Sequence, residues 1–226
     1  MKVTWIGQAG LLFEGNGIKI MVDPYLSDSC GEANPKSHRR VPVDESLFEI
    51  RPDVIVLTHD HLDHTDEQTL IRFLKDTKDI LVLAAPNAWT HVRQLGGDHN
   101  FVRMGAFTHW THSAGIRFEA VPADHSDVLA IGVIIDDGER KYYVTGDTLY
   151  NTAVLKALPE DIDTVFLPIN GKGNNMNAED ATRFADAIGV RRAVPLHFGL
   201  FDDLDPHSFT ARGRVIPTMY AEIPLD

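Results

Sequence analysis

The chain has 226 residues, and its 43% hydrophobic and 24% charged residues are typical of a folded globular protein rather than a disordered one. Its 21 basic and 33 acidic residues give a net charge of −12, which disfavours a nucleic-acid partner because such surfaces need clustered lysine and arginine. No apolar run approaches the ~18 residues of a membrane span, and the opening MKVTWI lacks the features of a signal peptide. The single cysteine, Cys30, excludes an internal disulfide. These features favour a cytoplasmic protein without membrane or nucleic-acid partners.

Short apolar runs at the start of the chain predict a strand meander. We expect strands over Val3–Ile6, Leu11–Glu14 and Ile18–Val22. Gly15-Asn16-Gly17 has the composition of a hairpin turn, and Asp23-Pro24 ends the third strand because proline cannot continue a ladder. A polar loop is expected from Tyr25 to about Pro42.

The next segment alternates strands and helices. Val54–Leu57 is an unbroken apolar run, as in a strand buried on both faces. Helices are expected over Glu67–Lys75 and Asn87–Leu95, with a strand over Ile80–Ala84 between them.

The second half repeats this mixture. The expected strands are Ile116–Val121, Ala130–Ile135, Lys141–Thr145, Thr164–Leu167 and Ala193–Leu196. Ala178–Ala187 is an amphipathic helix that Gly189 ends. Since no linker separates the two strand-rich halves, residues 1–226 are interpreted as a single α/β domain, with two packed sheets and helices outside them.

The segment THDHLDH directly follows the buried strand Val54–Leu57. It holds His59, His61, Asp63 and His64, whose nitrogen and oxygen atoms suit zinc, manganese or iron. His59 and His61 can bind one ion, and the loop turns Asp63 and His64 toward a second. The sequence therefore predicts a metal site at the carboxyl end of this strand.

Three further candidate ligands follow apolar strand signals. They are His125 in PADHS, Asp147 in TGDT and His197 in PLHFG. Alone, each is more readily explained as ordinary turn or hydrogen-bonded structure than as a ligand. Together with the first motif they complete a two-metal site in which His59, His61 and His125 bind one ion and Asp63, His64 and His197 bind the other. Asp147 bridges the two.

In their order along the chain, VDP at 22–24, THDHLDH, PADHS, TGDT and PLHFG resemble the metallo-β-lactamase superfamily. The resemblance implies a four-layer αββα sandwich with a dimetal site along one edge. NPKSHRR, GDTLYNT and LPINGKGNNMNAEDA are similar to the branch that contains L-ascorbate-6-phosphate lactonase. That finer resemblance implies a small-molecule hydrolase that assembles as a homo-oligomer.

A metal pair of this kind (zinc or manganese, with iron as an alternative) would lower the pKa of a bridging water toward ~7 and hold a hydroxide for attack. Asp63 would carry a proton to the leaving group. The leading hypothesis is a hydrolase of small anionic substrates, with a lactone favoured. A phosphodiesterase acting on nucleic acid or phospholipid is a second hypothesis, and a metal-binding or interaction protein without turnover is a third.

Residues outside the ligand set are also candidates for function. Asp23 is expected to hydrogen-bond a ligand imidazole. The basic run of Lys36, His38, Arg39 and Arg40 and the loop with Lys172 are expected to clamp a substrate anion, with Asn170, Asn175 and Asn177 adding neutral donors. His91, His99, His109, His112 and His207 are interpreted as surface or capping residues.

Overall fold

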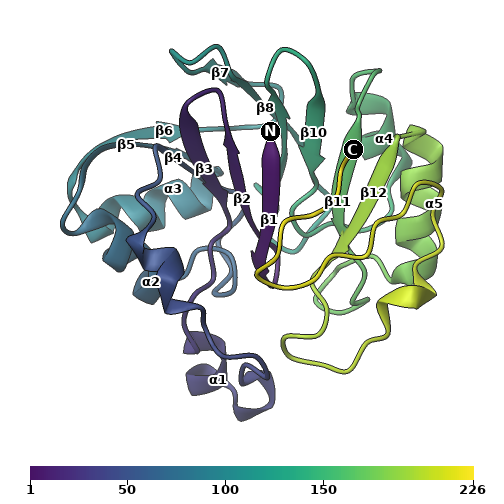
Figure 1. Cartoon of the computed structure of the whole chain (residues 1–226), viewed down its shortest axis with the longest axis horizontal. Coiled ribbons are helices and arrows are strands. Elements are labelled where there is room, and N and C mark those ends of the chain that lie inside the picture. Colours follow the sequence, from purple (N-terminus) through teal and green to yellow (C-terminus); the bar gives the residue numbers. More distant parts are fainter.

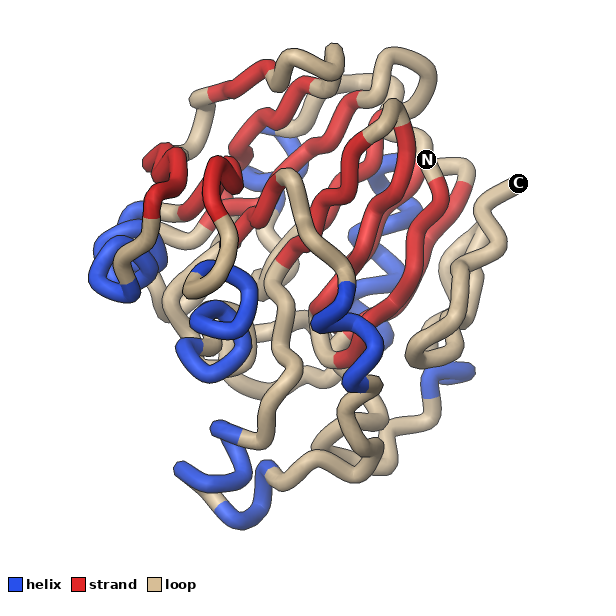
Figure 2. The backbone as a smooth tube through the Cα atoms, turned by 60° about the vertical axis from the view of Figure 1, so that its left-hand side comes forward, coloured by secondary structure: helices blue, strands red, loops and turns tan.

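The computed structural model describes residues 1–226, and its strands form two six-stranded sheets packed against each other (Figures 1 and 2). The first sheet takes its strands in chain order, with antiparallel pairing from β1 to β3 and parallel pairing from β3 to β6. Its strands are β1 (Lys2–Gly7), β2 (Gly10–Gly15), β3 (Ile18–Val22), β4 (Val54–Leu57), β5 (Lys78–Ala84) and β6 (Asp98–Arg103).

The second sheet has the order β12-β11-β10-β9-β8-β7. β10, β11 and β12 are parallel to one another, and the remaining pairs are antiparallel. Its strands are β7 (His109–Thr111), β8 (Arg117–Pro122), β9 (Ile131–Asp136), β10 (Lys141–Val144), β11 (Thr164–Pro168) and β12 (Arg192–Leu196). Both sheets therefore combine a parallel half with an antiparallel half.

Helices cover the outer face of each sheet. In Figure 1, α2 (Glu67–Leu74) and α3 (Pro86–Val92) lie beside the first sheet, and α4 (Thr152–Ala157) and α5 (Ala178–Ile188) beside the second. The short α1 (Ser29–Ala33) extends away from both sheets in the loop after β3. The arrangement is the four-layer αββα sandwich that the sequence predicted.

Two apolar clusters hold the layers together. The larger contains 43 buried residues and includes the facing sides of both sheets, and the smaller has 15 and lies between the first sheet and helices α2 and α3. Phe13 links the sheets, because its ring makes edge contacts with Tyr142 and Phe166 at centroid distances of 5.6 and 5.7 Å.

The C-terminal segment of the chain lies along β1 and β12, which are edge strands of the first and the second sheet. The N–H of Ile223 donates to the carbonyl of Val3 at 2.8 Å, so this segment adds to the exposed edge of β1. Earlier in the same segment, the N–H of Val215 donates to the carbonyl of Ala193 in β12 at 2.9 Å. Unpaired strand edges invite association with other chains, and this segment removes two of them.

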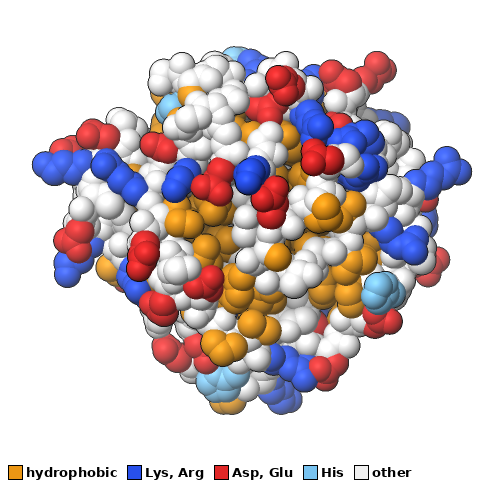
Figure 3. Space-filling view, in the orientation of Figure 1, with side chains coloured by type: hydrophobic (Ala, Val, Ile, Leu, Met, Phe, Trp, Pro, Cys, Tyr) orange, Lys and Arg blue, Asp and Glu red, His pale blue; other side chains and the backbone are white.

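Charged side chains of both signs are mixed in the upper part and around the rim of the face shown in Figure 3, and hydrophobic side chains gather at its centre. Exposed ion pairs such as Lys2 with Glu222 at 3.4 Å fit this distribution. No helix is long and apolar enough to cross a membrane.

Several elements were absent from the sequence interpretation. β6 and β7 are edge strands with polar residues at most positions, and α1 and α4 have only 5 and 6 residues. Such short segments carry too few apolar positions to show a period. The second predicted helix also divides, since α3 ends at Val92 and a 3₁₀ turn continues over Arg93–Leu95.

We expect Phe13→Ala to lower the free energy of unfolding by about 3–5 kcal/mol, because it opens a cavity between the sheets. Urea denaturation would measure the change. Phe107→Ala is the matched control, since the Phe107 side chain is 71% exposed and its loss should change stability by less than about 0.5 kcal/mol. Equal losses in the two variants would contradict the role given to Phe13.

Candidate metal centre

Seven segments end at one edge of the sandwich and bring polar side chains together there. β4 leads into the THDHLDH loop, and β8, β10 and β12 lead to His125, Asp147 and His197. The carboxyl ends of parallel strands meet at one edge of a sheet, so this convergence follows from the topology. β1, β3 and β11 reach the same edge and add Gln8, Asp23 and the 170–175 loop.

His59, His61 and His125 form a first cluster of candidate ligands with Asp147. His61 Nδ1 lies 3.1 Å from both His59 Nε2 and His125 Nε2. Asp147 Oδ2 approaches His59 Nε2 to 4.0 Å. Three imidazoles and a carboxylate at such separations can surround one divalent ion.

Asp63, His64 and His197 form a second cluster. Asp63 Oδ2 lies 3.2 Å from His197 Nε2 and 3.9 Å from His64 Nε2. Asp147 borders this cluster too, with Oδ1 at 3.3 Å from His64 Nε2 and Oδ2 at 3.4 Å from His197 Nε2. The structure thus brings together all seven ligands expected from the sequence, with Asp147 next to both groups.

The protein alone leaves key atoms of this cluster without partners. His64 Nε2 and Asp147 Oδ1 are fully buried and make no hydrogen bond. Buried polar atoms are normally satisfied, so two such atoms facing each other indicate an absent partner. Nitrogen and carboxylate oxygen donors in this arrangement fit a bound divalent metal.

The surroundings of the histidines shift their pKa values in opposite directions. Burial and the neighbouring charge of His64 hold the pKa of His59 well below its usual value, which keeps its imidazole neutral, the form that binds metal. Burial also disfavours protonation of His64, but the carboxylates of Asp147, Asp63 and Asp23 outweigh it and raise its pKa well above the usual value. Without metal, a proton on His64 balances part of the buried negative charge, and a cation binding there replaces it.

A shell of hydrogen bonds orients the ligand rings. Asp23 Oδ2 lies 2.8 Å from His64 Nδ1 and also accepts from the Thr58 hydroxyl, while Asp23 Oδ1 accepts the Thr58 N–H at 2.8 Å. The Thr58 hydroxyl lies 3.1 Å from His59 Nδ1, and the Asn174 carbonyl lies 3.2 Å from His125 Nδ1. These contacts occupy the nitrogens that point away from the cluster, so each Nε2 is left for metal.

The comparisons with known proteins agree with this geometry. A family model described as a β-lactamase superfamily domain matches residues 19–198. A UPF0173 metal-dependent hydrolase of Exiguobacterium sp. is 30% identical over 89% of this chain and 87% of its own length. One from Bacillus cereus is 29% identical over 94% of this chain and 92% of its own. This chain belongs to the UPF0173 metal-dependent hydrolases of the metallo-β-lactamase superfamily.

Solved structures share the fold of this UPF0173 hydrolase. The metallo hydrolase Igni18 of Ignicoccus hospitalis matches with a TM-score of 0.75 at 20% identity, over 98% of this chain and 96% of its own. YhfI of Bacillus subtilis, a metallo-β-lactamase fold protein, matches with a TM-score of 0.74 at 20% identity and covers 98% of both chains. The likeness confirms the αββα fold.

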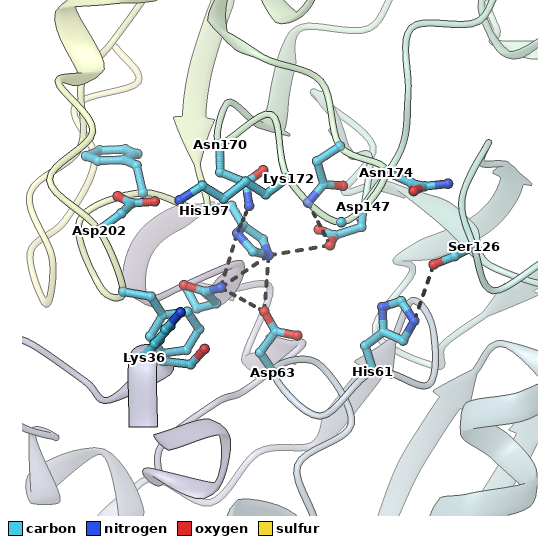
Figure 4. Close-up of a pocket in the computed structure, with 16 residues that line it drawn as sticks. Lys36, His61, Asp63, Ser126, Asp147, Asn170, Lys172, Asn174, His197 and Asp202 are labelled. Atoms are coloured by element: carbon cyan, nitrogen blue, oxygen red, sulfur yellow. Dashed lines mark hydrogen bonds and ion pairs between the residues drawn. The ribbon is translucent and has the colours of Figure 1, made fainter. Parts of the chain in front are cut away.

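The ligand clusters of the UPF0173 hydrolase open into a cavity of about 400 Å³ (Figure 4). Only two of its lining residues are hydrophobic, Phe198 and Phe201. Lys172 and Lys36 line it from two different loops. The polar lining suits a hydrophilic substrate rather than an acyl chain.

The structure corrects part of the expected anion clamp. Arg39 does not line the cavity, because its guanidinium donates to the carbonyls of Tyr25 and Ser27 and to the Tyr220 hydroxyl at 3.0, 3.3 and 2.7 Å. Arg39 therefore fixes the loop that carries Lys36, and Lys36 is the member of the basic run that reaches the cavity. Sequence alone could not distinguish adjacent cations that point in different directions.

The other residues of the basic run are also engaged outside the cavity. His38 Nδ1 lies 2.6 Å from Asp28 Oδ2, and Arg40 pairs with Asp203.

The asparagines of the 170–177 loop divide in the same way. Asn175 is buried, and its amide donates to Asp147 Oδ2 at 2.8 Å, so it supports a candidate metal ligand. The Asn170 amide lies 2.9 Å from His197 Nδ1. Asn177 accepts the N–H of Asp180 and caps α5. Of the residues expected to bind the substrate anion, Lys36 and Lys172 line the cavity without holding another part of the site.

Besides Thr58 and Asn174, sequence reasoning missed Gln8 and Asp127 at the site. Gln8 is buried, and its amide contacts both Asp63 and His197. Asp127 accepts from the Asp60 N–H at 3.1 Å and the Asn87 amide at 2.7 Å, which ties the His125 loop to the THDHLDH loop. Asp127 lies only two residues after His125, and Gln8 directly follows a strand that reaches the ligand edge. These two positions in the sequence are the features that could have pointed to Asp127 and Gln8.

We expect Asp23→Asn to weaken metal binding by about tenfold or more, because the amide cannot replace the carboxylate that orients His64 and holds Thr58. Competition with a chromophoric chelator would measure the affinity. Asp53→Asn removes a carboxylate that accepts only the Lys19 N–H, far from the cluster, and should leave the affinity unchanged. Equal affinities of the Asp23 variant and the unmodified chain would remove this role.

Proposed function

We propose that this chain hydrolyses a small anionic substrate, with a lactone as the favoured class, and that two divalent ions serve the reaction. The observation that carries the proposal is the position of Asp147, whose two oxygens lie 3.3 and 3.4 Å from nitrogens of His64 and His197 while it also belongs to the cluster of His59. A carboxylate shared by two ligand groups balances charge between two cations. The ligand set suits zinc or manganese and also accepts iron.

When bound, such a metal pair lowers the pKa of a water and polarises the oxygen of the bond under attack. The surrounding side chains hold the ligands rigid and exclude bulk water, since His59, His64 and Asp147 are almost wholly buried. Asp63 has a second task. Its Oδ2 lies against Gln8 and His197, whereas Oδ1 has no hydrogen-bond partner and remains available to carry a proton to the leaving group.

The cationic side chains of the cavity support an anionic substrate. In a protein of charge −12, Lys36 and Lys172 reach the same cavity from separate loops. A phosphate or carboxylate held between them would orient the reacting bond over the metal ligands, and that binding energy would lower the barrier. The motifs NPKSHRR and LPINGKGNNMNAEDA, which contain these lysines, resemble the lactonase branch and so favour a lactone.

We expect metal-replete protein to hold two ions per chain, and Asp147→Asn to lose at least one of them while retaining its fold. The amide keeps the shape of the side chain but removes the charge between the ions. Elemental analysis after gel filtration would count the metals, and circular dichroism would report the fold. A stoichiometry that never exceeds one per chain would contradict the metal pair.

We expect Lys36→Ala and Lys172→Ala each to lower kcat/KM for an anionic substrate by roughly tenfold, about 1.4 kcal/mol. An uncharged analogue should lose much less, because only the anion contacts the lysines. Lys156→Ala on α4 is the control for loss of a distant positive charge. Steady-state kinetics on matched charged and uncharged lactones would provide the comparison.

The choice of substrate class needs a panel of lactones, phosphodiesters and thioesters assayed with metal-loaded protein. Turnover of a lactone above that of a His59→Ala variant supports the proposal. Preferential cleavage of a phosphodiester would favour a phosphodiesterase, and no turnover of any member above the control would favour a binding protein.

A further inference from the structure

Gln8 occupies the turn between β1 and β2 and has an unusual backbone. Its φ of +49° lies in the left-handed region, which residues with a side chain seldom adopt. The residue is also 1% exposed, so solvent does not determine its conformation. A buried polar residue held in a costly backbone conformation indicates that surrounding contacts fix it there.

The main chain of Gln8 makes two of these contacts. Its carbonyl accepts the indole N–H of Trp5 at 2.9 Å and the backbone N–H of His197 at 3.1 Å. The Trp5 ring packs on Phe198 with centroids 4.9 Å apart, next to His197 in the chain. The turn of the first sheet is thus joined to the end of β12 in the second.

The side chain of Gln8 reaches into the ligand set. Its amide nitrogen donates to Asp63 Oδ2 at 2.7 Å and lies 3.1 and 3.2 Å from the two ring nitrogens of His197. Asp63 Oδ2 is also the oxygen that faces His197 Nε2 and His64 Nε2. Gln8 therefore contacts two of the three ligands of the second cluster and none of the histidines in the first.

We propose that Gln8 is a positioning residue for the second metal site, a role that rests on the metal pair proposed above. Its N–H fixes the Asp63 carboxylate with Oδ2 turned toward His197 Nε2 and His64 Nε2, the nitrogens that would hold the ion with it. The same amide and the carbonyl of Gln8 fix the ring and the backbone of His197. The first site has its own supports, Thr58 behind His59 and Asn174 behind His125, and does not depend on Gln8.

Two substitutions separate this role from a general effect on folding. Gln8→Met keeps the length of the side chain but has no donor. Gln8→Asn keeps the amide, withdraws it from Asp63 by one methylene and suits the left-handed backbone, so this variant should fold well. Gln94→Met changes an exposed glutamine on a surface turn and is the matched control.

The test is a measurement of stepwise metal binding. Chelator competition gives the affinity of each equivalent, and the absorption spectrum of cobalt(II) added in increments reports its coordination. We expect both Gln8 variants to weaken the second equivalent by tenfold or more and to alter its spectrum, with less than a twofold change in the first. The control should match the unmodified chain. Equal weakening of both equivalents would mark Gln8 as merely structural, and unchanged binding would remove the proposal.

A double-mutant cycle with Asp63→Asn keeps the two proposals separable. Because Gln8 contacts Asp63 as well as His197, Gln8→Met should weaken metal binding less in the Asp63→Asn background than in the unmodified chain. Additive losses would overturn the assignment of Gln8 to Asp63. If the unmodified chain binds only one ion, the proposed metal pair is wrong. The same cycle can then be measured on the affinity for that one ion, and it still decides whether Gln8 positions Asp63.

Discussion

The charge of Asp147 is the constraint on which the candidate site depends. The residue is 5% exposed, and an ionised group so far from water needs nearby compensation. His197 and His64 supply it in the free chain, and they outweigh the effect of burial to hold the pKa of Asp147 well below its usual value. The same geometry attracts divalent cations. Metal binding and protonation of these histidines therefore compete for one set of lone pairs.

The backbone next to Asp147 explains how the two sheets approach closely enough to share it. Gly146 has a φ of +60°, and a Cβ atom there would lie 2.9 Å from Cβ of Thr58 and 3.0 Å from the carbonyl of Ile131. Only glycine permits this contact without a shift. Thr58 in turn holds Asp23 and lies against His59, so one close approach connects the end of β10 with the ligand loop after β4.

Because the ligands come from both sheets, metal binding is coupled to the packing between them. His59, His61, Asp63 and His64 belong to one loop of the first sheet, whereas His125, Asp147 and His197 follow three strands of the second. An unfolded chain cannot gather these residues, so ions that bind the folded state add to its stability. Two sets of contacts hold the sheets together. In the core, Phe13 packs on Tyr142 and Phe166, and at the edge that carries the candidate ligands, Gln8 is hydrogen-bonded to His197.

The sequence by itself determined ten of the twelve strands, all but β6 and β7, and the seven candidate ligands, because each ligand follows an apolar strand or lies within a dense motif. Residue type and local order were sufficient there. The family resemblance of these motifs added the αββα architecture. Only the tertiary structure decided which polar neighbours serve the site. Arg39 and Lys36 are cations of the same basic run, yet Arg39 donates to backbone carbonyls and Lys36 lines the cavity. Asn175 supports Asp147, and Gln8, in a turn of the first sheet, supports His197 from 189 positions away. Side-chain direction and contacts between distant segments depend on how the sheets pack, and that information is not local to any motif.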